Sequence, residues 1–132
     1  MEKVIQFLKE NPVFYFATVD EGHPKVRPFG FSMLYNGKLY FGIGKNKKTF
    51  QQILKVPHVE ICTCSQNQEW IRIHGEACID ESPDALSTAF ETLPLLKQIY
   101  NDTTGQELGM VYLTNAVAEI ADMKGNFEEI KL

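Results

Sequence analysis

The amino-acid sequence predicts a mainly β protein, a small antiparallel barrel with helices on its outside. Six stretches rich in β-branched and aromatic residues indicate strands. Short turn sequences such as Asn36-Gly37 join several of them, so neighbouring strands are expected to pair as hairpins in an antiparallel sheet. Two helical stretches interrupt the strands, after the third and after the fifth. The expected strands span residues 13–20, 25–35, 38–44, 58–65, 70–80 and 110–123, with a short edge strand over 126–132.

The first two expected helices differ in how they begin and end. Residues 1–10 combine apolar and charged side chains in the pattern of an amphipathic helix. Pro12 ends it, because the residue before a proline avoids the helical conformation. Residues 46–55 predict a second helix with Asn46 as its N-cap, since a side-chain oxygen there can accept a bond from a free backbone N–H.

The third helical stretch spans residues 82–100 and carries its own start and break signals. Ser82 is a suitable N-cap, and Pro83 occupies the first helical position, where its missing N–H is not needed. Pro94 is expected to divide the stretch into two pieces, because proline cannot continue a helix from its interior.

Composition places the chain among soluble globular proteins. Its 132 residues, 44% apolar and 23% charged, fit one domain over residues 1–132. The net charge of −4 argues against a general nucleic-acid binder, which is normally basic. No apolar run approaches the roughly 20 residues of a membrane span, and the three cysteines are too few and odd in number for a disulfide framework. We therefore expect a cytoplasmic protein.

A lysine-rich turn precedes the second helix. Lys45, Lys47 and Lys48 lie at the end of a helix that already carries partial positive charge. A bound anion would explain why lysines lie at this helix N-terminus, because free N–H groups there bind phosphate and the lysines add positive charge. Thr49 offers a hydroxyl, and Gly42 lets a ligand approach the backbone closely. The alternative is a solvated surface cluster.

The second strand strengthens the phosphate hypothesis. Alternation places Arg27 and Phe29 on one face of the strand, with Pro28 and Gly30 on the other. Arg27 can make a bidentate phosphate contact. The Asn36-Gly37 hairpin brings this strand towards the lysine turn, so basic, hydroxyl and flat apolar groups can converge on a phosphorylated, planar ligand. The alternatives are a surface ion pair for Arg27 and an ordinary core position for Phe29.

These features, in this order and spacing, resemble the pyridoxamine 5′-phosphate oxidase-like family of split-barrel flavoproteins. The resemblance is strongest to its short single-domain members, including those grouped with nitroimidazole-resistance proteins. It runs from residue 10, at the start of "ENPVFYFATVDEGHPKVRPFGF", to residue 77, at the end of "WIRIHGEA". It implies a six-stranded antiparallel split β-barrel of the FMN-binding type, which forms a homodimer with flavin mononucleotide (FMN) at the interface.

The resemblance also implies which residues hold the cofactor phosphate. Arg27 matches the family arginine on the second strand that reaches the phosphate. Lys47 and Lys48 match an Arg-Lys pair with the same role, although lysine at position 47 keeps the charge and loses the bidentate fork.

Other matches concern the flavin ring. The backbone from Pro28 to Ser32 matches the segment along which the isoalloxazine lies. Phe41 and Gly42 match an aromatic-threonine pair, but Gly42 lacks the hydroxyl. Trp70 stands where longer oxidases have a glutamine that touches the flavin from the partner chain, and it could stack on the ring or wall it off instead. The predicted cofactor-binding residues are thus Arg27, Pro28, Phe29, Gly30, Ser32, Phe41, Gly42, Lys47, Lys48, Thr49 and Trp70.

The resemblance favours an FMN-dependent oxidoreductase acting on a small molecule, such as a nitroaromatic, a quinone-like compound or an oxidised cofactor. The flavin supplies the redox chemistry, so no catalytic side chain is named. The acidic ending "GNFEEIKL" lacks the basic substrate-binding residues of the true oxidases, so oxidation of pyridoxamine phosphate is not expected. The alternatives are a flavin-binding module without turnover and a relative that binds haem or a deazaflavin, with His58 or His74 as an axial ligand to haem.

A metal site is not expected. His58, Glu60, Cys62 and Cys64 alternate along one strand, and ligands spread along a strand cannot close a tetrahedron. We expect the two cysteines to be small buried residues instead.

Overall fold

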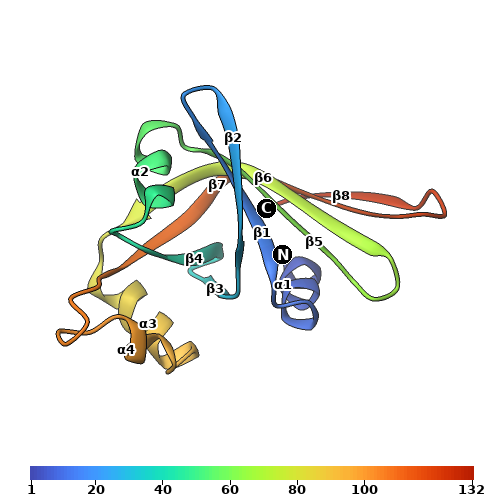
Figure 1. The fold of residues 1–132 in the computed structure, drawn as a ribbon. Helices are drawn as coiled ribbons and strands as arrows, with labels where there is room; N and C mark the ends of the chain where they lie inside the picture. Colours follow the sequence, from blue (N-terminus) through green and yellow to red (C-terminus); the bar gives the residue numbers. More distant parts are fainter.

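The computed structural model describes residues 1–132, which form one eight-stranded sheet and four helices (Figure 1). Every pair of neighbouring strands is antiparallel, so the predicted mainly β class is confirmed. The strands are β1 (Phe14–Asp20), β2 (His23–Phe29), β3 (Ser32–Tyr35), β4 (Lys38–Gly44), β5 (His58–Cys64), β6 (Glu69–Asp80), β7 (Leu108–Asp122) and β8 (Phe127–Lys131). The helices are α1 (Glu2–Glu10), α2 (Lys48–Lys55), α3 (Pro83–Thr92) and α4 (Leu96–Ile99).

The strand that we expected over residues 25–35 is divided at Gly30 and Phe31. The sheet order is β2-β1-β5-β6-β7-β4-β3, with β8 paired to β7. Since β2 and β3 lie at opposite ends of this order, the chain must leave one edge and join the other within two residues. The resemblance implied six strands. The structure has eight, because one expected strand is divided into β2 and β3 and because β8 is added at the C-terminus. β2 and β3 are therefore the two strands at the ends of the sheet order.

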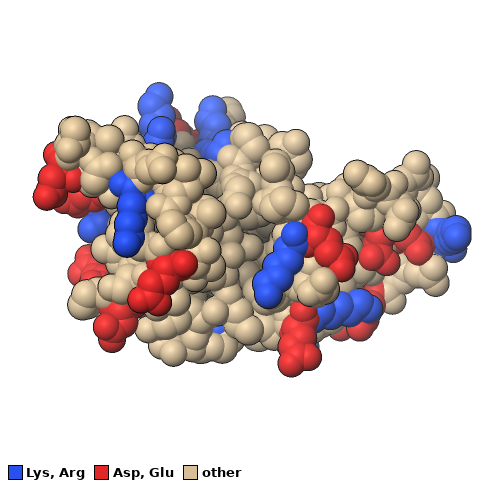
Figure 2. All heavy atoms as spheres, turned by 90° about the horizontal axis from the view of Figure 1, so that it is seen from below, with Lys and Arg blue, Asp and Glu red and all other residues tan.

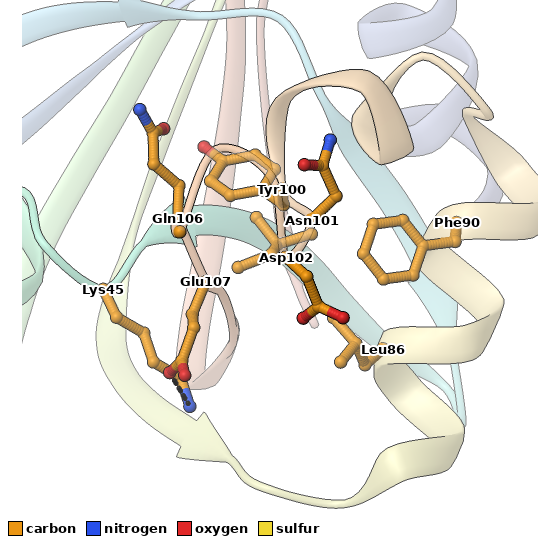
Figure 3. A pocket seen from close by; sticks show the side chains of 10 residues that line it. Lys45, Leu86, Phe90, Tyr100, Asn101, Asp102, Gln106 and Glu107 are labelled. Atoms are coloured by element: carbon orange, nitrogen blue, oxygen red, sulfur yellow. Dashed lines mark ion pairs between the residues drawn. The ribbon is translucent and has the colours of Figure 1, made fainter.

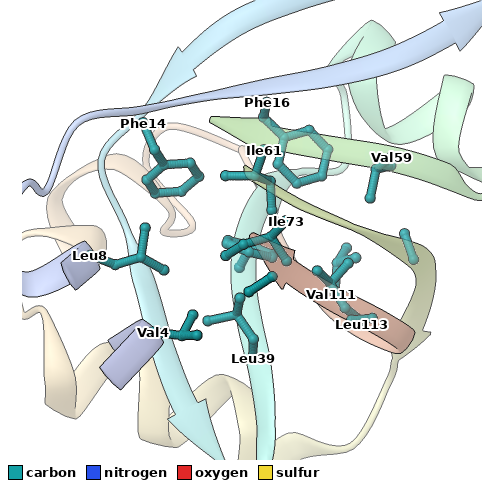
Figure 4. Packing of buried hydrophobic residues seen from close by; sticks show 14 of the residues in the cluster. Val4, Leu8, Phe14, Phe16, Leu39, Val59, Ile61, Ile73, Val111 and Leu113 are labelled. Atoms are coloured by element: carbon teal, nitrogen blue, oxygen red, sulfur yellow. The ribbon is translucent and has the colours of Figure 1, made fainter. Parts of the chain in front are cut away.

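The core shows that the sheet curls round on itself. Phe14 and Phe16 on β1 lie with their ring centroids 5.5 Å from that of Phe41 on β4, although three strands lie between β1 and β4 in the sheet order. All three side chains are 0% exposed. Val4 and Leu8 of α1 close the same cluster (Figure 4). Burial of this much aromatic and aliphatic surface is the main source of the fold's stability.

The third helical stretch follows the prediction. The Ser82 hydroxyl accepts a bond from the Ala85 N–H at 3.5 Å, and Pro83 begins α3. The chain around Pro94 separates α3 from α4, as expected. Ala85, Ala89 and Leu96 pack on the far side of the sheet in a second apolar cluster that includes Met33 and Tyr40. This second cluster holds the α3–α4 segment beside the end of β4.

The start of α2 corrects one prediction. The N-cap is Lys47 and not Asn46, and no side chain caps the helix. Gly44 to Lys47 form a turn that the Lys47 N–H closes onto the Gly44 carbonyl at 3.0 Å. Asn46 therefore lies inside the turn, one residue too early to reach the first helical N–H groups. The lysines stand at an uncapped helix N-terminus.

We expect Gly109→Ala to lower the free energy of unfolding by about 1–3 kcal/mol, the usual cost of overpacking a core. A methyl group at Gly109 would overlap the ring of Phe50 and would lie 3.1 Å from the Ile43 carbonyl oxygen. Urea unfolding measures the change. Combining the change with Phe50→Leu should cost less than the sum of the two single variants, because the smaller side chain makes room. Unchanged stability of Gly109→Ala alone would contradict this packing.

The surface carries charges of both signs. On the face seen in Figure 2, Lys and Arg side chains (blue) and Asp and Glu side chains (red) are interspersed among uncharged residues. None of the helices combines the length and the apolar character of a membrane span.

Candidate functional site

A pocket of about 560 Å³ opens where β2 and β4 end and α2 and α4 begin. That volume is typical of a site for a small ligand. The turn before α2 and the break after β2 both border it, so backbone irregularities expose its floor. Most of the predicted cofactor-binding residues line it together, namely Arg27, Pro28, Phe29, Gly30, Gly42, Lys47 and Thr49.

Two buried polar side chains hold Arg27 at the wall of this pocket. Arg27 Nη1 donates to the Thr18 Oγ1 on β1 at 2.8 Å, and Nη2 donates to the Gln52 Oε1 on α2 at 2.9 Å. Thr18 in turn donates to Gln52 at 2.5 Å. Nη1 also lies 3.2 Å from the Phe16 carbonyl oxygen. Arg27 is thus tied to β1 and to α2 at once.

Arg27 has no anionic partner in the chain. All its acceptors are neutral oxygens, and it takes part in none of the ion pairs. Partial burial lowers the pKa of the guanidinium, because removal from water disfavours the charged form. A guanidinium remains charged at neutral pH regardless. The pocket wall therefore presents an uncompensated positive charge, which favours an anionic ligand.

The start of α2 adds further donors. The backbone N–H groups of Lys48 and Thr49 have no partner in the chain, as expected for the first positions of an uncapped helix. Thr49 is only 7% exposed, yet its hydroxyl makes no hydrogen bond within the chain, unlike the hydroxyls of the buried Thr18 and Thr63. With Lys47 beside it, this end of the pocket combines donors and positive charge.

The opposite wall is apolar. Leu93, Leu95, Ile99 and Tyr100 from the α3–α4 segment line it. Leu95 and Ile99 are 54% and 43% exposed, so this wall presents open apolar surface to the pocket. No carboxylate lines the pocket. The site therefore has a cationic end and an apolar side, which suits a flat ligand with an anionic tail.

The structure does not bring the remaining predicted residues into this pocket. Lys48 lines a separate small hollow of about 120 Å³ on the other side of α2. Ser32 borders another hollow beside α1. Phe41 is fully buried in the core. Trp70 lies opposite Cys64, next to the turn that joins β5 and β6. Their part in cofactor binding stays a prediction.

A second pocket of about 480 Å³ adjoins the first and shares Tyr100 with it. Figure 3 shows the rings of Phe90 and Tyr100 on different sides of this hollow, with Asp102 between them. Lys45 pairs with Glu107 at 3.7 Å at its edge. The loop after α4 forms this hollow, and its sequence contains no motif that could have indicated it.

Thr18 and Gln52 were missing from the sequence-based set. Thr18 occupies an inward-facing position of β1, in alternation with Phe14 and Phe16. A polar residue at a core-facing position is a usable signal, because burial of a hydroxyl requires a partner. For Gln52 the sequence indicates burial less clearly, because it is a polar residue between the apolar Phe50 and Ile53 on the buried side of α2.

The other polar cluster lies away from the pocket and corrects the cysteine prediction. Cys62 and Cys64 are exposed, because Val59, Ile61 and Thr63 take the inward positions of β5. No group of His, Cys, Asp and Glu side chains is arranged to hold a metal ion. His58 and His74 line a hollow of about 440 Å³ with a single hydrophobic residue, a poor lining for haem.

The split barrel and its pocket with a cationic end and an apolar wall define the class of protein, and comparison with known families identifies it further. Residues 1–126 match a family model described as "Pyridoxamine 5'-phosphate oxidase". A solved NimC/NimA family protein from Clostridium acetobutylicum is 37% identical with a TM-score of 0.92, covering 100% of this chain and 92% of that one. The chain belongs to the pyridoxamine 5′-phosphate oxidase family, and the resemblance described from the sequence is confirmed.

More distant structures share the fold alone. A pyridoxamine 5'-phosphate oxidase-related, FMN binding protein from Nostoc punctiforme has a TM-score of 0.62 at 15% identity, covering 99% of this chain and 95% of that one. A heme binding protein from Mycobacterium smegmatis has a TM-score of 0.70 at 13% identity, and the match covers 93% of this chain and 54% of that one. No curated protein matches the chain.

Proposed function

We propose that the protein binds FMN in the 560 Å³ pocket and uses it as a flavin-dependent oxidoreductase. The observation that carries the proposal is the uncompensated charge of Arg27 facing the same pocket as Lys47 and the unbonded Thr49 hydroxyl. FMN carries a phosphate dianion and a planar ring. Its phosphate matches the donor set, and the presence of an FMN binding protein among the structural relatives agrees with this choice.

Each part of the pocket has a role in this proposal. Arg27, Lys47 and Thr49 hold the phosphate, supported by the free N–H groups at the start of α2. The backbone from Pro28 to Phe31, together with Gly42, provides a surface for the ring, and the α3–α4 wall excludes water from it. When bound, the flavin supplies the redox chemistry. The side chains bind and orient it, and none is assigned a catalytic role.

The pocket lining narrows the class of substrate. Apart from its cationic end, which the phosphate occupies, no charged side chain lines the pocket. We therefore propose an uncharged planar acceptor, such as a nitroaromatic or a quinone-like compound. Steady-state assays with reduced nicotinamide and a panel of such acceptors test this. If no donor reduces the bound flavin, the protein is a flavin-binding module without turnover.

We propose the cytoplasm as the location. All three cysteines are free, and Cys62 and Cys64 are exposed. Exposed free thiols persist in a reducing compartment, whereas an oxidising one would pair them with other thiols.

The experiment that tests the cofactor is a visible absorption spectrum. The protein is purified without added cofactor and measured before and after incubation with FMN and desalting. Two flavin bands that remain with the protein support the proposal. A colourless protein that rejects FMN overturns it, and an intense haem band would establish the haem alternative instead.

We expect Lys47→Ala to weaken FMN binding by about 1–3 kcal/mol, the loss expected for a charge-assisted phosphate contact. Lys48→Ala should also weaken it, by less, because the Lys48 side chain lines a different hollow and acts only through its charge. Isothermal titration measures both. Lys55→Ala is the control, since Lys55 lies at the other end of the same helix. Wild-type affinity in both variants would rule out the phosphate role of the lysine turn.

We expect a homodimer that places the flavin at its interface. Tyr15 on β1 and Val26 on β2 are 51% and 67% exposed on the outer sheet face, and Val13 just before β1 is 55% exposed; a second copy would cover these side chains. In the dimer the partner supplies Trp70 to the ring. Analytical ultracentrifugation with detection in the flavin band checks this. A monomer that still carries flavin would contradict the interface placement.

A further inference from the structure

A hydrogen-bonded network spans three elements beneath the cationic end of the pocket. Arg27 comes from β2, Thr18 from β1 and Gln52 from α2. Their polar atoms are linked pairwise at 2.8, 2.9 and 2.5 Å. Thr18 is 2% and Gln52 7% exposed, so the two acceptors of these bonds have little access to water. Both side chains are therefore held in place, and they fix the guanidinium in turn.

The network fills one edge of the guanidinium and leaves the other free. Thr18 Oγ1 and Gln52 Oε1 bond to each other, so they lie side by side on the edge between Nη1 and Nη2. The Nε–H has no partner in the chain, and Nη2 donates only to Gln52. Nε and Nη2 form the second fork of a guanidinium, the geometry that suits a bidentate phosphate contact. Arg27 also lines the pocket, so this fork is available to a ligand there.

We propose that Thr18 and Gln52 are positioning residues that hold the free fork of Arg27 for the cofactor phosphate, so that the pocket selects FMN over unphosphorylated riboflavin. This inference rests on the proposed function. Neither residue is assigned a contact with the flavin.

Charge and flexibility explain why the positioning matters. A long arginine side chain loses considerable rotamer freedom when it is fixed, and here folding of the chain has already fixed it. Neutral partners leave its charge uncompensated, whereas a carboxylate in their place would neutralise it. Without Thr18 and Gln52, the half-exposed guanidinium would turn towards solvent. Riboflavin has no phosphate, so its binding should not depend on them.

The test compares the two flavins. Gln52→Met and Thr18→Val remove the acceptors at similar volume, Thr18→Ser retains the hydroxyl, and Gln51→Met is a matched control on the exposed side of α2. Each protein is freed of flavin and titrated with FMN and with riboflavin, followed by quenching of flavin fluorescence. We expect the Kd for FMN to rise about tenfold or more in Gln52→Met and Thr18→Val, with riboflavin changed less than about twofold. Thr18→Ser and Gln51→Met should keep the wild-type ratio of the Kd for riboflavin to the Kd for FMN.

A second measurement needs no flavin. The ¹⁵N-edited NMR signal of the Arg27 side chain should be sharp and resolved in the wild type and should collapse into the averaged arginine envelope in Gln52→Met. Gln52→Glu is the decisive variant if a methionine at position 52 prevents folding. It keeps an acceptor, so the Arg27 signal should persist, but its charge neutralises the guanidinium, so FMN affinity should fall.

The two possible failures are distinguishable. A wild-type protein that binds neither flavin overturns the proposed function and this inference with it. If the wild type binds FMN but Gln52→Met and Thr18→Val keep its ratio of FMN to riboflavin affinity, only the positioning roles are overturned. Equal loss of both flavins also overturns them, since it would show a structural role alone.

Discussion

Replacing Arg27 by alanine should lower the affinity for FMN about 100-fold, or about 2.7 kcal/mol. The variant removes the guanidinium that faces the pocket, and with it a bidentate, charge-assisted contact to the phosphate. The fold should survive, because Thr18 and Gln52 still bond to each other at 2.5 Å. Isothermal titration with FMN, together with urea unfolding of the flavin-free protein, separates the two effects.

Matched variants show whether charge or geometry is responsible. Arg27→Lys keeps the charge but loses the fork, so its FMN affinity should fall between those of the wild type and Arg27→Ala. Lys25→Ala removes an exposed charge two residues away on β2, outside the pocket, and should bind FMN like the wild type. Riboflavin affinity should change little in all three. Wild-type FMN affinity in Arg27→Ala would place the phosphate elsewhere.

The parts of the fold that depend on local chemistry were predictable from the sequence. Pro94 divides α3 from α4 because proline cannot donate the helical hydrogen bond. Asn36-Gly37 forms the turn between β3 and β4, and this turn depends on those two residues and not on the position of the hairpin in the molecule. The break at Gly30 was not predictable in this way. Residues 25–35 read as one extended run, and only the pairing of β2 with β1 and of β3 with β4 divides them. The choice of partner strand is a tertiary property.

The residues of the candidate site likewise fall into two groups, those that local chemistry identifies and those that only tertiary packing brings to the site. Arg27, Lys47 and Thr49 were identifiable because their residue types suit a phosphate, and the spacing of Arg27 and Lys47 also resembles a known family. Gln52 and the apolar wall at Leu95 carry no such signal. Gln52 acquires its role only when α2 packs against β1, and Leu95 lines the pocket only because the α3–α4 segment folds back beside β4.

We expect Phe41→Ala to lower the free energy of unfolding by about 3–5 kcal/mol, the usual loss for removing a buried aromatic ring. Phe41 is 0% exposed, and its ring centroid lies 5.5 Å from those of Phe14 and Phe16 across the barrel. Truncation therefore opens a cavity at the point where the sheet closes on itself. Since the total stability of a domain is only about 5–15 kcal/mol, this is a large fraction of it. Urea unfolding of the flavin-free protein measures it.

Phe41→Leu separates a core role from a cofactor role. Leucine keeps most of the buried volume, so the stability should fall by less than about 1.5 kcal/mol. Because the Phe41 side chain does not line the pocket, the FMN affinity of this variant should equal that of the wild type, and any role of Phe41 in binding should act through its backbone. A selective loss of FMN affinity in Phe41→Leu, at nearly unchanged stability, would instead show that the aromatic ring shapes the site. The comparison thus tests whether the end of β4 serves the cofactor through side chains or through the path of its main chain.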